Sequence, residues 1–162
     1  MSTPARSIWW TPQARPLRIS ALMDLYERNF RLVQRLLPEL ELPFDDAVSR
    51  SRTDLPLRLT VIERGRYTAA FRLTYEFAEG DVRAMEPDLR VRVYRDAQLA
   101  EALNRPQRPH WLAAEEGDPA AMQYLDEQWS RNLLLNKWLT YLLEHGHGFG
   151  MAARPRLHAV PA

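Results

Sequence analysis

The sequence predicts an α+β fold: an antiparallel sheet of three to four strands packed on one face by an N-terminal and a long C-terminal helix. Residues 57–94 alternate between apolar and polar types, which is typical of strands that bury one face of a sheet. A stripe of apolar residues at helical spacing precedes this segment, and a long apolar helical stretch follows it. With 162 residues and 46% hydrophobic content, the chain is long enough for one such core.

The first expected element is a helix that begins near Ile19 and ends before Pro38, after an extended arm over residues 1–18. Its apolar side chains recur on one helical face: Ile19, Leu22, Met23, Tyr26, Phe30, Val33 and Leu37. Such a face must pack on something, and the apolar side of the sheet is the expected partner. The arm carries Trp9 and Trp10, and we expect it to dock on the core, because a free tail rarely carries so much apolar surface.

The strands follow a loop over residues 38–56 and are expected at about 57–63, 66–77 and 88–95. The side chains expected on the inner face are Leu57, Leu59, Val61, Tyr67, Ala69, Phe71, Leu73, Tyr75, Phe77, Leu89, Val91 and Val93. Those expected on the polar face include Arg58, Thr60, Arg72, Thr74, Arg90, Arg92 and Tyr94. The sequence therefore predicts a sheet with one buried face and one arginine-rich face.

The turn between the first two strands sets their register. Their apolar residues share a face only if the turn contains an odd number of residues, because the side-chain period of a strand is two. A three-residue loop from Arg64 to Arg66, which pairs Glu63 with Tyr67, meets this condition.

Residues 96–103 are ambiguous. They are strong helix formers behind a good N-cap residue, Asp96. They also fit a continuation of the third strand through a bulge, or a return strand, and the pattern favours none of these. We expect a single domain over residues 19–149 and a flexible tail over residues 150–162.

The last helix is expected to begin at Asp118 and Pro119, a capping residue followed by proline at the first helical position, and to end at Gly146. Its second half is apolar nearly all round: Leu133, Leu134, Leu135, Trp138, Leu139, Tyr141, Leu142 and Leu143. Such a helix is buried on more than one side. Either it lies centrally within the domain, or its spare face forms a homodimer.

Composition excludes several classes of protein. The formal charge of +1 gives no argument for attraction to nucleic acid or to a membrane surface. The absence of cysteine excludes disulfides, thiolate metal sites and cysteine nucleophiles. The N-terminus lacks the apolar region of a signal peptide, no apolar run approaches the ~18 residues of a membrane span, and a cytoplasmic location is expected. Lys137 is the only lysine among 22 Lys and Arg residues, a bias that a GC-rich genome also explains.

Three segments together resemble the YqiB-like family, a bacterial domain of unknown function, over about residues 20–147. In the first helix the matching residues are Met23, Glu27, Asn29, Phe30, Leu36, Leu37 and Pro38. In the strands they are Arg58, Leu59, Thr60, Glu63, Arg66, Tyr67, Thr68, Tyr94, Asp96, Ala97, Ala100 and Glu101. In the last helix they are Asp126, Glu127, Asn132, Trp138, Leu139, His145 and Gly146.

The resemblance implies a small cytoplasmic bacterial protein, often encoded near nucleotide-metabolising hydrolases. It implies no established activity, cofactor or catalytic residue. The chain departs from the family pattern at Arg95 and Gln123, which stand where the family often has histidines. A role that depends on those imidazoles therefore does not carry over to this chain.

Two kinds of side chain could form a site. Arginines interleaved with tyrosines can clamp phosphate and stack a base, or they can simply pair with acids such as Glu76 and Asp88 on a solvated face. Carboxylates could form a metal or acid–base site if they converge, or they could cap turns and pair with arginines. The candidate ligand- or partner-binding residues are Arg58, Glu63, Arg66, Tyr67, Arg92, Tyr94, Asp96, Glu101 and Asp126. No catalytic residue, metal ligand or cofactor is assigned.

The remaining motifs are weak. His145 and His147 could bind zinc with a third ligand, or supply positive charge at the end of the last helix. No serine lies in a Gly-x-Ser-x-Gly elbow, and no glycine-rich phosphate loop is present. Acyl transfer and P-loop nucleotide hydrolysis are therefore poor interpretations.

The predicted function is that of a non-catalytic binding or interaction module, which uses the Arg/Tyr-rich sheet face or its turn-side rim. The alternative is a nucleotide- or phosphate-ligand-binding protein, or a hydrolase, that uses clustered carboxylates with a divalent metal. The expected partner is a protein or a small anionic ligand, and neither a membrane nor a nucleic acid is expected. A homodimer through the C-terminal helix remains open.

Overall fold

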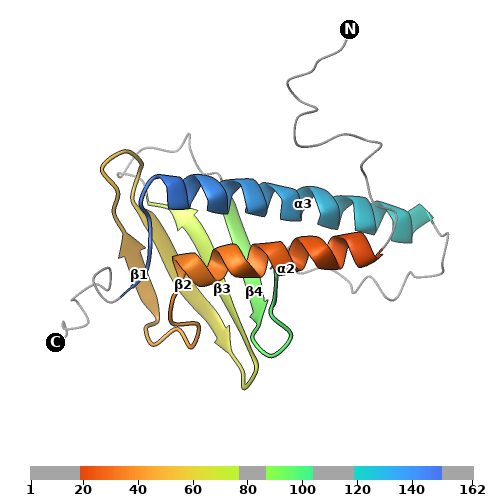
Figure 1. Ribbon diagram of the computed structural model, residues 1–162, viewed down its shortest axis with the longest axis horizontal. Helices are drawn as coiled ribbons and strands as arrows, with labels where there is room; N and C mark the ends of the chain where they lie inside the picture. The colour runs from red at the N-terminus through yellow and green to blue at the C-terminus, as the bar shows by residue number, and fades with distance from the viewer. Residues whose placement is uncertain (1–18, 77–86, 104–118, 151–162) are drawn as a thin grey trace, which may run out of the picture.

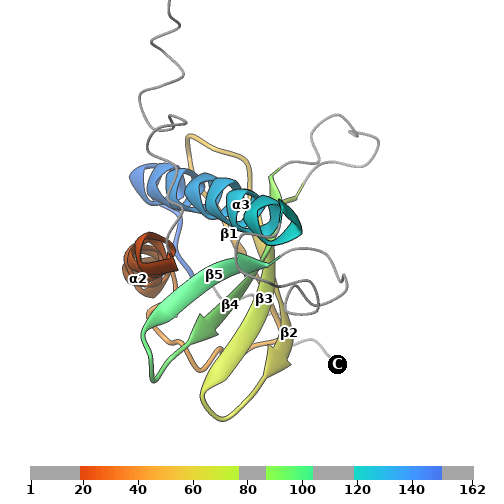
Figure 2. The ribbon, with the colours of Figure 1, turned by 90° about the vertical axis from the view of Figure 1, so that its right-hand side faces the viewer.

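The computed structural model describes residues 19–76, 87–103 and 119–150, and shows two helices on one face of a five-stranded antiparallel sheet (Figure 1). The elements are α2 (Ile19–Leu36), β1 (Asp46–Ser49), β2 (Leu57–Arg64), β3 (Thr68–Tyr75), β4 (Asp88–Tyr94), β5 (Leu99–Leu103) and α3 (Pro119–Glu144). The strands lie in chain order across the sheet, so each pairs with its sequence neighbours in a meander. Figure 2 shows both helices on the same side of the sheet.

The α+β class and both helices are confirmed, but the expected three to four strands are too few. The structure adds β1 inside the predicted loop, where four residues are too short to show a periodic signal. The ambiguous segment after β4 forms a turn followed by the return strand β5. Gln98, with a left-handed φ of 58°, ends that turn. The predicted arm over residues 1–18, most of the predicted tail and Phe77 lie outside the described residues.

The register between β2 and β3 corrects the predicted one. Leu59 pairs with Leu73, whereas the predicted loop would have paired it with Phe71. A shift of two residues preserves the face of every side chain, and the expected inner face is therefore retained. Tyr67 does not pair with Glu63 and does not face the core: it lies in the turn, and 51% of its surface is exposed.

A β-bulge explains the error in the turn. The pairing shifts by one residue between Val61 and Glu63, so that Ile62 is the additional residue, and the hairpin then closes with Arg64 opposite Ala69. A bulge bends the strand and redirects a side chain. Here Ile62 is directed outward, with 47% of its surface exposed.

The core lies between the inner sheet face and the helices. Most buried strand residues follow the predicted alternation: Leu57, Leu59, Ala69, Phe71, Leu73, Leu89, Val91, Val93, Ala100 and Ala102. Ala70 departs from it, because it is buried although its neighbours on both sides are buried too. The buried residues of α2 are Leu22, Leu25, Tyr26, Asn29, Phe30, Val33 and Leu36. The predicted stripe was wrong at Ile19 and Met23, which are exposed. On α3, Leu134 and Tyr141 are exposed, so this helix is buried on fewer sides than its composition predicts.

Buried amides join the two helices to the last strand. Asn29 Nδ2 donates to the carbonyl of Asn132 at 3.2 Å, and Asn136 Nδ2 donates to Asn29 Oδ1 at 2.9 Å. Asn132 Oδ1 accepts a hydrogen bond from the backbone N–H of Ala102 at 2.7 Å. Because that N–H lies on the side of β5 away from β4, α3 satisfies a backbone donor at this margin of the sheet.

The predicted end of α3 is confirmed. Gly146 adopts a φ of 82°, a left-handed conformation that glycine reaches without a steric penalty. The N–H of Gly146 bonds to Leu143 O at 3.1 Å and that of His147 to Leu142 O at 3.0 Å, the two bonds of a Schellman cap. In the part of the chain that the structure describes, neither helix is long and apolar enough to cross a membrane.

Candidate functional site

The arginines nearest the β1 side of the polar sheet face are paired with acids. Arg58 donates to both carboxylate oxygens of Asp46, at 3.2 and 2.6 Å, and to Glu76 at 2.8 Å. Arg72 makes a two-point contact with Asp88 at 2.8 and 2.6 Å. The hydrogen bond with Asp46 is the main cause of a raised pKa at Arg58. These arginines fit the interpretation of a solvated, internally paired face, because binding an anion would compete with these contacts.

Four of the predicted site residues lie in one chain of contacts, which we call the carboxylate–tyrosine chain: Glu63, Arg92, Tyr94 and Glu101. Arg92 donates to Glu63 Oε1 at 3.2 Å, and Tyr94 donates to Glu101 Oε2 at 2.7 Å. Burial and the hydrogen bond to Glu101 raise the pKa of Tyr94 to about 12, and contact with Arg92 opposes this rise. The sheet therefore brings these four residues together across β2, β4 and β5.

Glu101 is the hub of this chain. Burial raises the pKa of Tyr26 and of Tyr124, and the negative charge of Glu101 raises both further. The carboxylate thus lies near phenols from both helices as well as Tyr94. Gln128 Nε2 in turn donates to the Tyr26 hydroxyl at 3.0 Å, which continues the polar contacts onto α3.

A second group, which we call the rim, lies where β2 turns into β3 and consists of Ile62, Arg66 and Tyr67. The Arg66 guanidinium carbon lies 5.3 Å from the centroid of the Tyr67 ring, a cation–π arrangement. The side chains of Ile62 and Tyr67 are exposed at 47% and 51%. The rim therefore presents an aliphatic side chain, an aromatic ring and a guanidinium to solvent.

Two further arginines hold the backbone around the rim. Arg64 donates to the carbonyl of Leu42, at 3.2 and 3.1 Å, and to that of Phe44 at 2.7 Å. Arg95 donates to the carbonyls of Gly65 and Arg66, both at 2.9 Å, and to that of Leu40 at 3.3 Å. Arg64 and Arg95 belong to the arginine–tyrosine cluster that the sequence suggests as a phosphate clamp, but they are not among the candidate site residues, and only their positions beside turns distinguish them from the other arginines.

The predicted carboxylates do not converge. Glu63 contacts Arg92, Glu101 contacts Tyr94, and Asp96 accepts a hydrogen bond from the N–H of Ala97 at 2.9 Å, which is the turn-capping role. Among the described residues, no three His, Cys, Asp or Glu side chains form a group that could hold a metal ion.

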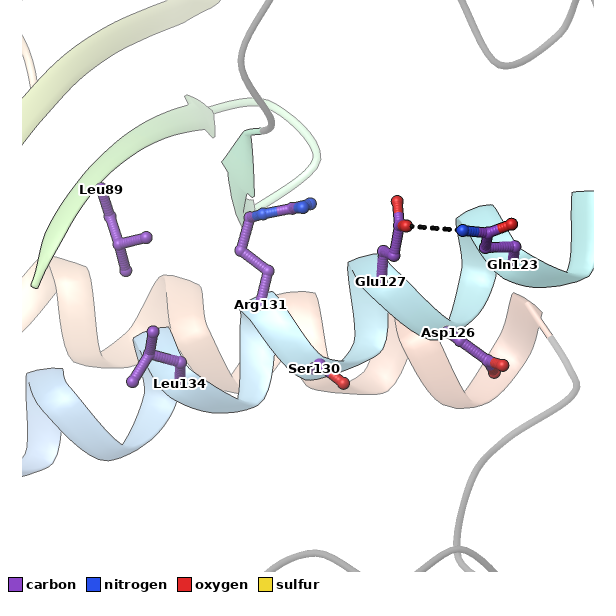
Figure 3. A pocket seen from close by; sticks show the side chains of 7 residues that line it. All are labelled: Leu89, Gln123, Asp126, Glu127, Ser130, Arg131 and Leu134. Atoms are coloured by element: carbon purple, nitrogen blue, oxygen red, sulfur yellow. Dashed lines mark hydrogen bonds between the residues drawn. The ribbon is translucent and has the colours of Figure 1, made fainter. Parts of the chain in front are cut away.

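Asp126 lies apart from the other predicted site residues, on α3. It borders an open pocket of about 570 Å³ whose lining is Leu89, Gln123, Asp126, Glu127, Ser130, Arg131 and Leu134. Figure 3 shows Glu127 and Arg131 projecting from one side of α3, and Asp126 pointing away from them. Gln123 donates to Glu127 at 3.2 Å. None of the other predicted site residues lines this pocket.

The structure also assembles a serine, a histidine and an aspartate that the sequence analysis did not group. His147 Nδ1 lies 2.9 Å from Ser49 Oγ, and His147 Nε2 lies 3.1 Å from Asp54 Oδ2. Tyr75 donates to the same Asp54 oxygen at 2.8 Å, and the N–H of Gly148 donates to Ser49 Oγ at 3.0 Å. We call Ser49, Asp54, Tyr75 and His147 the clasp. No sequence signal marks it, because 98 residues separate Ser49 from His147.

Three of the four clasp residues are closed to solvent, and the fourth, Tyr75, is half-buried. The His147 side chain is 0% exposed, that of Asp54 is 9% exposed, and Ser49 is 2% exposed. Burial lowers the pKa of His147, and the neighbouring Asp54 carboxylate only partly opposes this effect. A serine without access to a substrate cannot act as a nucleophile, so the clasp joins the segment after α3 to the β1–β2 loop rather than forming a reactive site.

The two histidines of the C-terminal segment have different surroundings. His145 Nδ1 lies 2.6 Å from Thr53 Oγ1, and its ring centroid lies 4.1 Å from that of Tyr141. His147 is engaged on both ring nitrogens within the clasp. Both imidazoles therefore contact residues of the β1–β2 loop: His145 contacts Thr53, and His147 contacts Asp54. The hypothesis that the two histidines bind zinc did not include these contacts.

The fold defines a small α+β protein in which two helices cover a five-stranded antiparallel meander. A domain family described as "Protein of unknown function (DUF1249)" matches residues 32–148. Uncharacterized protein YqiB of Escherichia coli (strain K12) is 32% identical over 126 residues, which cover 77% of this chain and 88% of that protein. YqiB proteins of Escherichia coli O6:H1 and O157:H7 match equally. The chain therefore belongs to this family, which confirms the resemblance, and no solved structure gives a significant match.

Proposed function

We propose that the protein is a non-catalytic binding module whose contact surface is the rim and whose partner is another protein. One observation carries the proposal: Arg64 and Arg95 together bond to backbone carbonyls of the α2–β1 segment and of the β2–β3 turn, while Ile62, Arg66 and Tyr67 stay exposed. A turn held in this way loses little conformational entropy on binding, which favours affinity. Tyrosine and arginine are also the residue types enriched at energetically important contacts.

The rest of the polar sheet face supports binding less. Arg58, Arg72 and Arg92 are each engaged by a carboxylate. Arg90 is exposed and contacts no partner among the described residues, but it lies directly across from Arg72 in the sheet. Because Arg72 is already paired with Asp88, Arg90 shares no site with a second available guanidinium at this position, and it serves as a control.

The test compares two double variants as baits for proteins captured from a lysate of the source organism. Arg66→Ala with Tyr67→Ala removes the rim, and Arg90→Ala with Tyr141→Ala removes the same residue types elsewhere. Tyr141 is 41% exposed, close to the 51% of Tyr67. We expect proteins captured by the wild type and by the control to be lost from the rim variant. Equal capture by all three baits would contradict the proposal.

The alternative, a nucleotide- or phosphate-binding protein or hydrolase, remains a prediction. The position of Tyr94 and Tyr124 near Glu101 is the feature that favours it, because both rings are only partly buried and aromatic groups can stack on a base. A thermal-shift screen with nucleotides and divalent metals tests it. A shift seen with the wild type and lost in Glu101→Gln would support this alternative over the rim. The cytoplasmic location and a homodimer through α3 also remain predictions.

A further inference from the structure

The two margins of the sheet differ in how their backbone groups are satisfied. At the β5 margin, the side chain of Asn132 accepts the outward N–H of Ala102. At the other margin, β1 is the outermost strand, and it has only four residues (Figure 1). An edge strand offers unpaired N–H and C=O groups, which are a template for another strand.

The hydrogen-bonding pattern shows which residues of β1 face outward. Val61 N donates to Asp45 O at 2.9 Å, in the same register that pairs Ala47 with Leu59. Hydrogen-bonded and non-bonded pairs alternate in an antiparallel ladder, so Ala47 bonds to β2, whereas Asp46 and Val48 direct their backbone groups away from it. Neither Asp46 nor Val48 makes a backbone bond outside the ladder within the described residues.

The side chains along this margin carry opposite charges at either end. The Asp46 side chain is 42% exposed, although it also contacts Arg58. Val48 is half-buried, and Arg50 is exposed with no hydrogen-bond or ion-pair partner in the described part of the chain. Asp46, Val48 and Arg50 thus follow one another at every second position. In an antiparallel pair of two copies, the acid of each strand can lie opposite the base of the other.

We propose that β1 is an interface at which a second copy of this chain pairs in antiparallel fashion about a twofold axis at Val48. In this register Val48 of each copy meets Val48 of the other, and Asp46 of each copy lies opposite Arg50 of the other. A twofold axis at Asp46 or at Arg50 would instead oppose like charges, which destabilises cross-strand pairs. Charge complementarity therefore favours the register centred on Val48 over those centred on Asp46 or Arg50.

The interface is isologous, so each favourable contact occurs twice. It is also small, since few residues take part, and dimerisation is therefore expected to depend on protein concentration. This inference is independent of the rim, whose proposed partner is a different protein.

Sedimentation velocity over a concentration series provides the test. The wild-type mass is expected to rise from 18.9 kDa towards twice that value as the concentration increases. Asp46→Arg and Arg50→Asp should each remain monomeric, because each places like charges across the interface. An equimolar mixture of the two variants should dimerise again, because the introduced arginine of one variant then meets the introduced aspartate of the other. Circular dichroism checks that each variant is folded.

Three outcomes would overturn the proposal. The first is a wild-type mass that stays at 18.9 kDa at every concentration. The second is a mixture of the two charge variants that does not associate. The third is a dimer that the charge changes leave intact, but that Leu134→Asp with Tyr141→Asp abolishes, because those exposed residues lie on α3. That last result would assign the interface to α3.

Discussion

The clasp and the rim are both polar clusters next to a loop, but they direct their side chains differently. In the clasp, His147 contacts Ser49 and Asp54, and all of these groups are closed to solvent. At the rim, Arg95 bonds to backbone carbonyls, and Tyr67 remains exposed. The clasp therefore has the residue types of a hydrolytic site, but a substrate cannot reach them. The rim is open to solvent, but it has no reactive side chain. Exposure, rather than residue type, separates a stabilising cluster from a candidate binding surface.

The largest expected effect comes from breaking the clasp with His147→Ala. The change removes a contact from both Ser49 and Asp54 in a buried site and leaves a cavity, so the free energy of unfolding should fall by about 3 kcal/mol. Urea denaturation measures this loss. The matched control is His145→Ala, whose partner Thr53 is exposed, and it should cost less than about 1 kcal/mol. Equal losses in the free energy of unfolding for the two variants would contradict the prediction that the clasp stabilises the fold more than the contacts of His145 do.

A smaller effect is expected from acidification. Burial lowers the pKa of His147 below its ordinary value of 6.5, so the unfolded chain binds this proton more readily than the folded one. The stability that depends on a neutral His147 is fully present above pH 6.5, and it is lost as the pH falls through the pKa of His147 in the folded protein. Urea midpoints of the wild type should therefore fall between pH 7.5 and 5.5 by more than those of His147→Gln. Parallel pH profiles would mean that His147 does not titrate within the clasp.

The smallest effects come from removing one hydroxyl at each cluster. Tyr75 donates to Asp54 in the clasp at 2.8 Å, and Tyr75→Phe should lower the free energy of unfolding by about 1 kcal/mol. Tyr67→Phe at the rim should change it by less than about 0.5 kcal/mol, because the ring is exposed. The comparison would fail if Tyr67→Phe were the more destabilising of the two in thermal or urea unfolding.

The sequence predicted those parts of the molecule in which burial leaves a periodic pattern. The inner residues of β2, β3 and β4 and the ends of α3 follow from alternation, from Pro119 and from Gly146. β1 was missed because four residues carry too little pattern, and the bulge at Ile62 was missed because no residue type marks an inserted position. The predicted site was only partly assembled, since Glu63, Arg92, Tyr94 and Glu101 meet whereas Asp126 lies elsewhere.

The clasp could not be predicted, because its residues lie far apart in sequence and none belongs to a motif. Ser49 ends β1 and Asp54 lies in the loop that follows it, and both meet His147 only after the sheet and α3 are in place. Arg64 and Arg95 were likewise indistinguishable from the other arginines until their carbonyl partners were known. Local patterns report burial, whereas polar contacts between distant segments depend on the completed fold.

The meander has a consequence for the order in which a nascent chain can fold. Every strand pairs with its sequence neighbours, so the sheet can form by successive hairpin closures as the chain leaves the ribosome. The contacts that cover its inner face are of a different kind, because 103 residues separate Asn29 from Asn132 and 98 separate Ser49 from His147. The apolar face of the sheet is therefore not fully covered until α3, the last described element to be synthesised, is in place, and part of that face stays exposed during the interval.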